Sequence, residues 1–223
     1  MIAANVATAK YLGKRKIPLL YRVHATPTAD SLEDLRSFLS ERGLTLTGGD
    51  DPDAADYAKL LAQAATRPDS HLIQTVMLRS MQRAVYSPHN DGHFGLALDD
   101  YAHFTSPIRR YPDLLVHRGI KHLEAGGKPL NFDYDLAGME ALGQQCSEAE
   151  RRADDATRDV DDFLKCEYMR DSLGEMFYGT VTGVTGFGLF VELEGIFATG
   201  LVHVSSLSSD FYHFDAKSRA LKG

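Results

Sequence analysis

The chain has 223 residues, of which 43% are hydrophobic, and its formal net charge is −7. This composition is typical of a globular chain with a packed core, and the acidic balance argues against general affinity for nucleic acid. Because the apolar runs are too short for a membrane span and the first residues lack a signal pattern, we expect a cytoplasmic protein without membrane association. Cys146 and Cys166 lack metal-ligand spacing, which argues against a disulfide framework and a zinc site.

The first part of the chain is predicted to be mainly helical. Apolar spacing and end signals predict helices over four ranges: 1–14, 29–42, 52–65 and 69–86. The first has an apolar side made of Ile2, Val6, Ala9 and Leu12. Gly43 should close the second helix, and the segments PLLYRVHATPT (18–28) and HFGLAL (93–98) should be extended.

The stretch SPIRR, residues 106–110, carries the first functional signal. Ser106 and Pro107 predict a helix start, with the serine as cap and the proline at the first helical position. Exposed N–H groups at a helix start attract anions, and an arginine adds a planar fork that fits phosphate. Arg109 and Arg110 therefore suggest a phosphate site, although such a capped start followed by solvated arginines is also common.

Charge in this region strengthens the phosphate interpretation. Between residues 106 and 122 four cations accompany a single acid, Asp113, so the local net charge is +3. A polyanion should meet the protein here. The helix is expected to be kinked by Pro112 and closed by Gly126 and Gly127.

A very long helix is predicted next. Its apolar stripe consists of Met139, Leu142, Cys146, Ala149, Ala153, Ala156, Val160 and Phe163. The small residues in the middle of the stripe suggest close packing by another element. The other faces mix carboxylates with arginines, so we interpret them as solvated and salt-bridged rather than metal-binding.

From Gly174 onward the pattern changes from helical spacing to alternation. Strands are predicted over three ranges: 176–184, 188–193 and 200–204. This is a second domain, in which Phe187, Phe190 and His203 can form a surface that stacks on bases. Packing in a core is an equally good explanation of these aromatic residues.

Several of these motifs together resemble the ribonuclease II family. They are HFGL (93–96), Tyr101, FTSPIRRY (104–111), Asp113, His117, the start MIAAN and the tract ERRADDATRDVDDFLKCEYM (150–169). From Gly174 the chain is similar to the RNA-binding OB-fold module that follows the catalytic domain in that family. The resemblance covers nearly the whole chain.

The resemblance implies a fold, an activity and roles for residues. It implies an α+β chain, with residues 1–173 as the mostly helical C-terminal part of an RNB catalytic domain and 174–223 as a truncated OB-fold module. The activity is hydrolytic, processive 3′-to-5′ degradation of RNA to nucleoside 5′-monophosphates with Mg²⁺. Arg109 matches the catalytic arginine that contacts the scissile phosphate, while Ser106, Arg110, Phe187, Phe190 and His203 are expected to bind RNA.

The metal site is not expected within this sequence. In the family a cluster of aspartates well upstream of SPIRR holds the metal, so we expect this chain to be a fragment of a longer enzyme. The stretch GGDDPDAADY (48–57) looks like such a cluster, but we interpret Asp51 as a helix cap followed by Pro52. Only three strand-like runs fit before Gly223, which also suggests a truncated barrel.

The partner is expected to be single-stranded or structured RNA. The alternative is a stand-alone RNA-binding or regulatory protein without the metal site.

Overall fold

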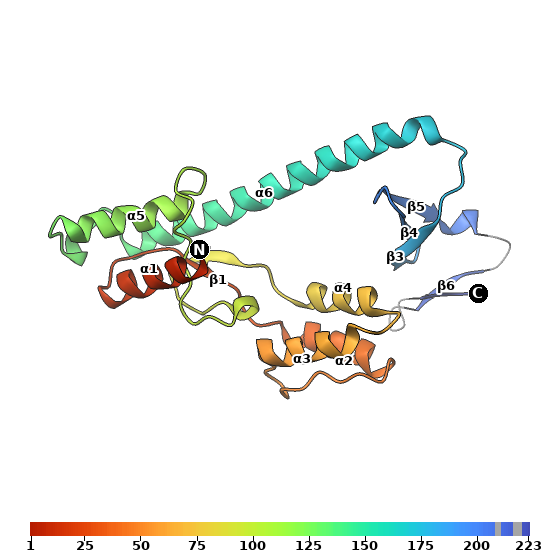
Figure 1. Ribbon diagram of the computed structural model, residues 1–223, viewed down its shortest axis with the longest axis horizontal. Coiled ribbons are helices and arrows are strands. Elements are labelled where there is room, and N and C mark those ends of the chain that lie inside the picture. The colour runs from red at the N-terminus through yellow and green to blue at the C-terminus, as the bar shows by residue number, and fades with distance from the viewer. Residues whose placement is uncertain (208–210, 216–219) are drawn as a thin grey trace. The chain divides into compact units, whose positions relative to one another are not determined.

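The computed structural model describes residues 1–207, 211–215 and 220–223 and divides into two compact units (Figure 1). The first unit comprises residues 1–39 and 43–152, and the second comprises residues 40–42 and 153–223. This division falls within a long helix, so the domain ranges 1–173 and 174–223 stay a prediction. Within the described ranges, no helix is long and apolar enough to cross a membrane.

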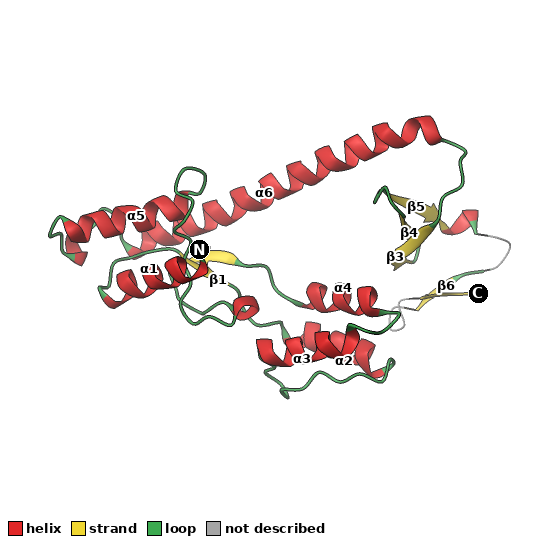
Figure 2. Ribbon diagram, viewed as in Figure 1, coloured by secondary structure: helices red, strands yellow, loops and turns green. Residues whose placement is uncertain are grey.

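Helices make up most of the first unit (Figure 2). They are α1 (Ile2–Lys14), α2 (Ala29–Ser40), α3 (Ala54–Ala64), α4 (Ser70–Ser80), α5 (Tyr111–Glu124) and the first half of α6 (Leu136–Met169). Gly43 follows α2 with a φ of 68°, a left-handed conformation that favours glycine at a helix end. The predicted helices over 1–14 and 29–42 are confirmed to within a few residues. On α1, however, Ile2 is exposed, and the buried residues are Asn5, Ala9 and Leu12.

Helix α3 begins later than predicted. Its cap is Asp53, whose carboxylate accepts the backbone N–H of Asp56 at 2.9 Å while the Asp56 carboxylate accepts the Asp53 N–H at 3.2 Å. The prediction that Asp51 caps this helix is wrong, because this reciprocal capping box fixes the start two residues further on.

Two predictions about extended and helical segments are also wrong. Helix α4 stops at Ser80, and the short strand β2 (Val85–Ser87) pairs antiparallel with β1 (Tyr21–Val23). Residues 94–96 form the 3₁₀ turn η1 (Phe94–Leu96) instead of a strand. The end of the predicted helix over 69–86 is a strand because it pairs with β1, which is far away in the sequence. The predicted strand over 93–98 is interrupted by a tight turn that ends at Ala97, which has a φ of 52°.

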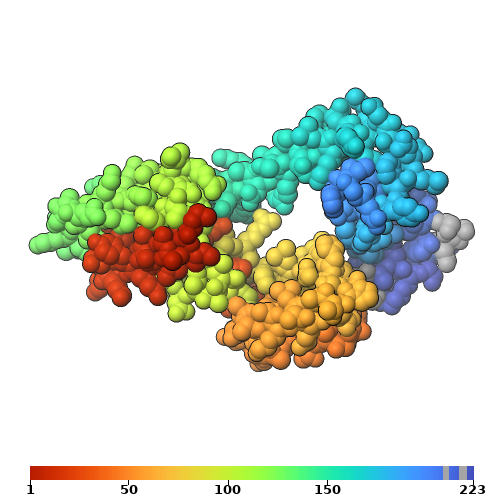
Figure 3. All heavy atoms as spheres, in the orientation of Figure 1, coloured from red at the N-terminus to blue at the C-terminus, as the bar shows by residue number. Residues whose placement is uncertain are grey.

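The first unit has separate apolar clusters. Helices α2, α3 and α4 bury one cluster around Leu35, Leu60 and Ile73. Helices α1 and α5 pack side by side, as the red and green spheres of Figure 3 show. A Cβ on Gly119 of α5 would lie 3.1 to 3.4 Å from Ile17 and Leu12, so this glycine permits the close approach.

The long helix α6 confirms the predicted stripe only in its first half. Met139 is buried, and Leu142 and Cys146 are half-buried against Leu20, Tyr86 and Leu115. Val160 and Phe163 are 58% and 64% exposed, and the alanines at 153 and 156 are exposed too. The close packing predicted on the alanines is therefore not found among the described residues.

The second unit contains a three-stranded antiparallel sheet in the order β3-β4-β5. Its strands are β3 (Gly179–Thr185), β4 (Gly188–Leu193) and β5 (Thr199–His203), which confirms the three predicted runs. Strands β6 (His213–Asp215) and β7 (Ala220–Lys222) form a further hairpin, so the count of only three strands is wrong. Each of these strands has three residues, which is too short for alternation to reveal. Short turns complete the chain: η2 (Pro129–Asn131), η3 (Arg170–Ser172) and η4 (Val204–Ser206).

Candidate active site and RNA-binding surface

The SPIRR residues form a turn before α5 and not the first turn of the helix. The Ser106 carbonyl accepts the backbone N–H groups of Arg109 at 3.3 Å and Arg110 at 3.1 Å. Helix α5 begins at Tyr111 with Arg110 as its N-cap residue, so the prediction that Ser106 caps it is wrong. The predicted kink at Pro112 is wrong as well, because this proline lies in the first helical turn, where its missing N–H breaks no helical bond.

A buried carboxylate holds this turn in place. Asp113 is fully buried, and its Oδ1 accepts the Ser106 backbone N–H at 2.7 Å and the Arg110 guanidinium at 2.8 Å. The second oxygen, Oδ2, and Arg110 Nε have no hydrogen-bond partner among the described residues. Arg110 therefore neutralises a buried charge, and its side chain is committed to the turn.

Arg109 lies on the outside of the same turn. Its side chain is exposed, next to a fully exposed Ile108, and makes no hydrogen bond or ion pair within the described part of the chain. A guanidinium without a protein acceptor keeps its whole donor fork available for an anion. The two adjacent arginines thus have different environments.

Groups from α1 and α5 support the segment that leads into the turn. Asn5 donates to the Tyr101 hydroxyl at 3.1 Å and accepts the Phe104 backbone N–H at 3.2 Å. The His117 ring stacks on Phe104 at 4.4 Å, and its Nε2 lies 3.0 Å from the Phe104 carbonyl. These contacts fix the backbone from both sides. Asn5 was not predicted from the sequence, although a polar residue on the buried side of a helix is a usable signal.

Two half-buried histidines, His93 and His103, lie beside these contacts. Burial, followed by the charge of His24, lowers the pKa of His93 to about 4. Burial, followed by the charge of Arg110, lowers the pKa of His103 to about 4. His103 Nδ1 lies 2.9 Å from the Tyr86 hydroxyl, whose own pKa is raised to about 12 by burial. Both histidines are therefore neutral at pH 7 and serve as hydrogen-bonding and packing groups.

An ion pair links β1 to α6 within the first unit. Arg22 donates to Glu150 at 2.6 Å, and its guanidinium carbon lies 4.6 Å from the centre of the Tyr86 ring. Ser147 accepts the Tyr86 backbone N–H at 2.9 Å, and a Cβ on Gly143 would meet the Tyr86 carbonyl oxygen at 2.7 Å. The backbone of helix α6 at Gly143 thus packs directly against the backbone of strand β2 at Tyr86.

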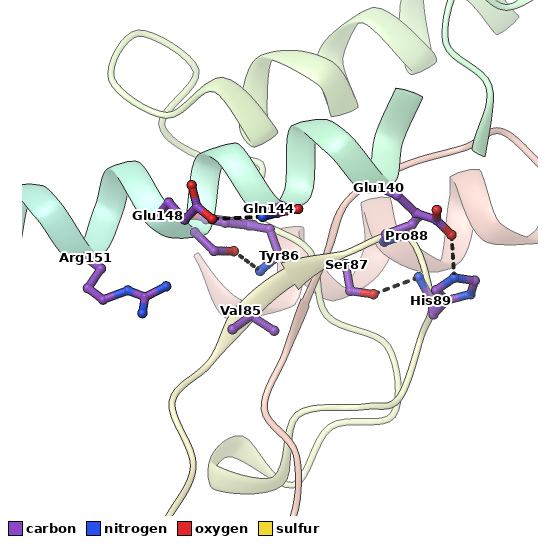
Figure 4. Close-up of a pocket in the computed structure, with 10 residues that line it drawn as sticks. Val85, Tyr86, Ser87, Pro88, His89, Glu140, Gln144, Glu148 and Arg151 are labelled. Carbon is purple, nitrogen blue, oxygen red and sulfur yellow. Dashed lines mark hydrogen bonds and ion pairs between the residues drawn. The ribbon is translucent and has the colours of Figure 1, made fainter. Parts of the chain in front are cut away.

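A shallow pocket of about 370 Å³ lies between β2 and α6 (Figure 4). His89 contacts Glu140 at 3.1 Å, and Gln144 donates to Glu148 at 2.9 Å (Figure 4). Its lining thus mixes acidic groups with His89 and Arg151, and the predicted site residues are not among them. A mixed lining of this kind has no clear preference for the RNA backbone.

The predicted stacking residues share one face of the sheet. In the β4-β5 register Gly188 pairs with His203 and Phe190 pairs with Leu201, so Phe190 and His203 point to the same side. Phe187, which is 49% exposed, meets Phe190 edge-to-face at 6.1 Å. His203 Nδ1 accepts the Ser205 N–H at 3.3 Å, so the hydrogen of the ring is carried by Nε2, which can act as a donor.

Glycine is required beside these aromatic residues. Gly188 has a φ of 158°, and a Cβ there would lie 2.3 Å from the Val202 carbonyl oxygen. Only glycine allows β4 and β5 to pair this closely at that position.

The metal site implied by the resemblance is not built by these residues. No group of three or more His, Cys, Asp or Glu side chains is placed to hold an ion within residues 1–207, 211–215 and 220–223. In the stretch 48–57, Asp53 and Asp56 are used by the capping box, and Asp56 also bonds Thr47 and Lys59.

Two known domain families match parts of this chain. The RNB domain model matches residues 1–126, and the S1 RNA binding domain model matches residues 170–223. The chain is 51% identical over 235 aligned residues to Ribonuclease R of Escherichia coli (strain K12), with all of this chain and 28% of that protein covered. The chain thus spans about a quarter to a third of the length of this relative.

Solved structures of Mycoplasma genitalium RNase R have the same fold. Its complex with ribose methylated single-stranded RNA matches with a TM-score of 0.92 and 28% identity, over all of this chain and 35% of that one. Its complex with double-stranded RNA matches with a TM-score of 0.81 and 26% identity, over 99% of this chain and 40% of that one. The chain is therefore α+β, with a mostly helical RNB part followed by a small antiparallel S1 part of the OB-fold type.

Proposed function

The chain belongs to the RNB family, that of ribonuclease II, and from this premise we propose that the complete protein is a 3′-to-5′ exoribonuclease of the ribonuclease R type. Single-stranded or structured RNA is its substrate, and nucleoside 5′-monophosphates are its products. The observation that carries the proposal is Arg109, an exposed guanidinium without a partner among the described residues, on a turn that a buried ion pair fixes.

The role of Arg109 follows from the steps of phosphodiester hydrolysis. Water attacks the phosphorus of the terminal phosphodiester, a new P–O bond forms, and the bond from phosphorus to the 3′ oxygen of the preceding nucleotide breaks. That oxygen takes up a proton and becomes the new 3′ end. Negative charge grows on the non-bridging oxygens during the attack, and the Arg109 fork donates to them most strongly in the transition state.

The neighbouring residues position Arg109. Arg110 and Asp113 hold the turn, and the backbone N–H of Ser106, the first residue of the turn, donates to the same carboxylate. The expected RNA contacts of Ser106 and Arg110 are therefore proposed to be limited to the backbone and to the exposed edge of the guanidinium. Preorganised donors lose no free energy to reorganisation when the transition state forms.

The sheet face in the second unit is proposed to hold the RNA chain. Phe187 and Phe190 offer ring surfaces for bases, and His203 offers an Nε2–H donor. Stacking on an aromatic side chain contributes about 1–3 kcal/mol per base and tolerates any sequence. The Mg²⁺ ions of the family are assigned to residues of the complete protein outside this chain, and we place the protein in the cytoplasm.

A degradation assay with the complete protein tests the proposal. A 5′-labelled oligoribonucleotide in Mg²⁺ should shorten from its 3′ end and release nucleoside 5′-monophosphates, and a chelator should stop the reaction. The present chain alone should leave the same RNA intact. RNA that is bound by the complete protein but never shortened would instead indicate a non-catalytic RNA-binding protein.

A further inference from the structure

A second arginine on α5 forms a polar cluster with two tyrosines. Arg118 Nη1 donates to the Tyr111 hydroxyl at 3.2 Å and also to the Tyr134 hydroxyl. The two hydroxyl oxygens lie 3.3 Å apart. Tyr111 is the first residue of α5, and Tyr134 lies in the segment before α6, so the guanidinium is held from two elements. We call these three residues the Arg118 cluster.

No acidic group neutralises this arginine within the described residues. The only carboxylate between residues 106 and 122 is Asp113, which is buried and paired with Arg110. Arg118 itself is exposed, and within the described ranges its hydrogen bonds go to the two phenols. An exposed charge on α5 that neutral groups hold in a fixed orientation is therefore available to an anion.

The donor geometry fits a phosphate group. Nη1 donates to the tyrosines, while Nε and Nη2 have no acceptor in the part of the chain that the structure describes and form an edge that can donate to two phosphate oxygens. One phenol can add an O–H donor, because the other O–H is used in the hydrogen bond between the two hydroxyls. The Tyr111 hydrogen bond together with burial keeps the pKa of Tyr134 above its ordinary value. Because the phenols already restrict the guanidinium, binding loses less side-chain entropy than at a free surface arginine.

We propose that the Arg118 cluster is a binding site for a backbone phosphate of RNA, distinct from the phosphate that Arg109 contacts. This inference rests on the proposed action on RNA. The backbone of Arg118 lies seven residues after that of Tyr111 on α5, about 10 Å along the helix axis, and its guanidinium reaches back to the Tyr111 hydroxyl. Arg109 is not a member of this cluster, so the two arginines are assigned to different phosphates, and the Arg118 cluster contributes to affinity rather than to bond cleavage.

Arginine side-chain NMR of this chain tests the site directly. Inorganic phosphate should shift the Nε–Hε signal of Arg118 in a saturable way, and this shift should weaken in Tyr111→Phe and Tyr134→Phe, which remove only hydroxyls. Arg15 is the matched control, because it is an exposed arginine that lies 3.8 Å over the Tyr11 ring on α1. A nucleoside 5′-monophosphate and oligouridine should shift Arg118 too, and oligouridine should do so at the lowest concentration.

Salt dependence of oligouridine binding by the complete protein provides the second measurement. Arg118→Gln should reduce the slope of log affinity against log salt by about 0.7, the value for one phosphate contact with a single strand. Arg15→Gln should leave the slope unchanged. An Arg118 signal that no phosphate compound moves, or an unchanged slope in Arg118→Gln, would overturn the inference and show a structural role. Either result would leave the proposed nuclease intact, because RNA degradation is measured separately.

Discussion

The adjacent residues Arg109 and Arg110 have the same side chain but differ in whether it contacts a buried partner. Arg110 donates to a fully buried Asp113, whereas Arg109 points to solvent without a partner among the described residues. Removing one member of a buried pair leaves an uncompensated charge, which is more costly than the pair was worth. Arg109 is therefore suited to contact substrate, and Arg110 stabilises the turn.

Asp113→Asn should destabilise the protein strongly. The neutral amide removes the partner of Arg110 and weakens the bond from the Ser106 N–H, so the free energy of unfolding should fall by about 3 kcal/mol. Urea unfolding measures this loss. Asp133→Asn is the control, because Asp133 is exposed in the segment before α6. Equal stability of the two variants would contradict the structural role of Asp113.

The half-buried histidines His93 and His103 predict a pH dependence of stability. The pKa values of His93 and His103 are lowered to about 4, below the ordinary value of 6.5, so the unfolded state binds more protons between these values. Their contribution to stability is therefore complete above pH 6.5 and is lost as pH falls toward 4. The free energy of unfolding, measured by urea titration across this range, should fall steadily. His103→Gln should flatten the decline, and an unchanged decline in that variant would contradict the assignment.

Among the secondary-structure elements, α6 depends on one close approach to the sheet. A Cβ at Gly143 would lie 2.7 Å from the Tyr86 carbonyl oxygen, which is backbone and cannot swing away. At Gly138 the nearest atom is the flexible Asp135 carboxylate at 3.1 Å. Gly143→Ala should therefore lower the free energy of unfolding by roughly 1–3 kcal/mol, whereas Gly138→Ala should be neutral or mildly stabilising. If thermal unfolding shows the two variants to be alike, the tight packing of α6 on β2 is not needed.

Sequence periodicity predicted the long elements well and the short ones poorly. Helix α1 and strand β4 are long enough for their apolar residues to indicate an element, so their existence could be predicted, although Ile2 at the start of α1 is exposed. Strand β2 has three residues and is defined by its pairing with β1, which local sequence does not reveal. The start of α5 was misplaced because Ser106 and Pro107 form a cap-like pair, while the Asp113 contact makes a separate turn of them.

The candidate site was predicted in its residues but not in its support. The motif placed Ser106, Arg109 and Arg110 together, and the register of β4 and β5 places Phe190 and His203 on one face. The different environments of Arg109 and Arg110 depend on a burial that only the fold determines. Asn5 contacts Tyr101 across 96 residues, a separation that no local pattern spans.

For the whole molecule, we propose two RNA-handling features, one in each compact unit. The turn with Arg109 belongs to the first unit, and the sheet face with Phe187 and Phe190 belongs to the second. The chain spans 28% of the Escherichia coli relative. We propose that the metal ligands of the family belong to the remainder of the complete protein. The central claim is thus that this chain supplies the arginine that stabilises the transition state.

Single-turnover cleavage of an oligoribonucleotide by the complete protein tests this claim most directly. Arg109→Ala should slow cleavage by about 10²-fold or more with little change in RNA affinity or melting temperature, and Arg109→Lys should recover little of the rate. Arg110→Ala should mainly lower the melting temperature, because it leaves Asp113 buried without its partner. Cleavage by Arg109→Ala within roughly threefold of the parent rate would contradict the account, as would a larger loss of rate in a stably folded Arg110→Ala variant.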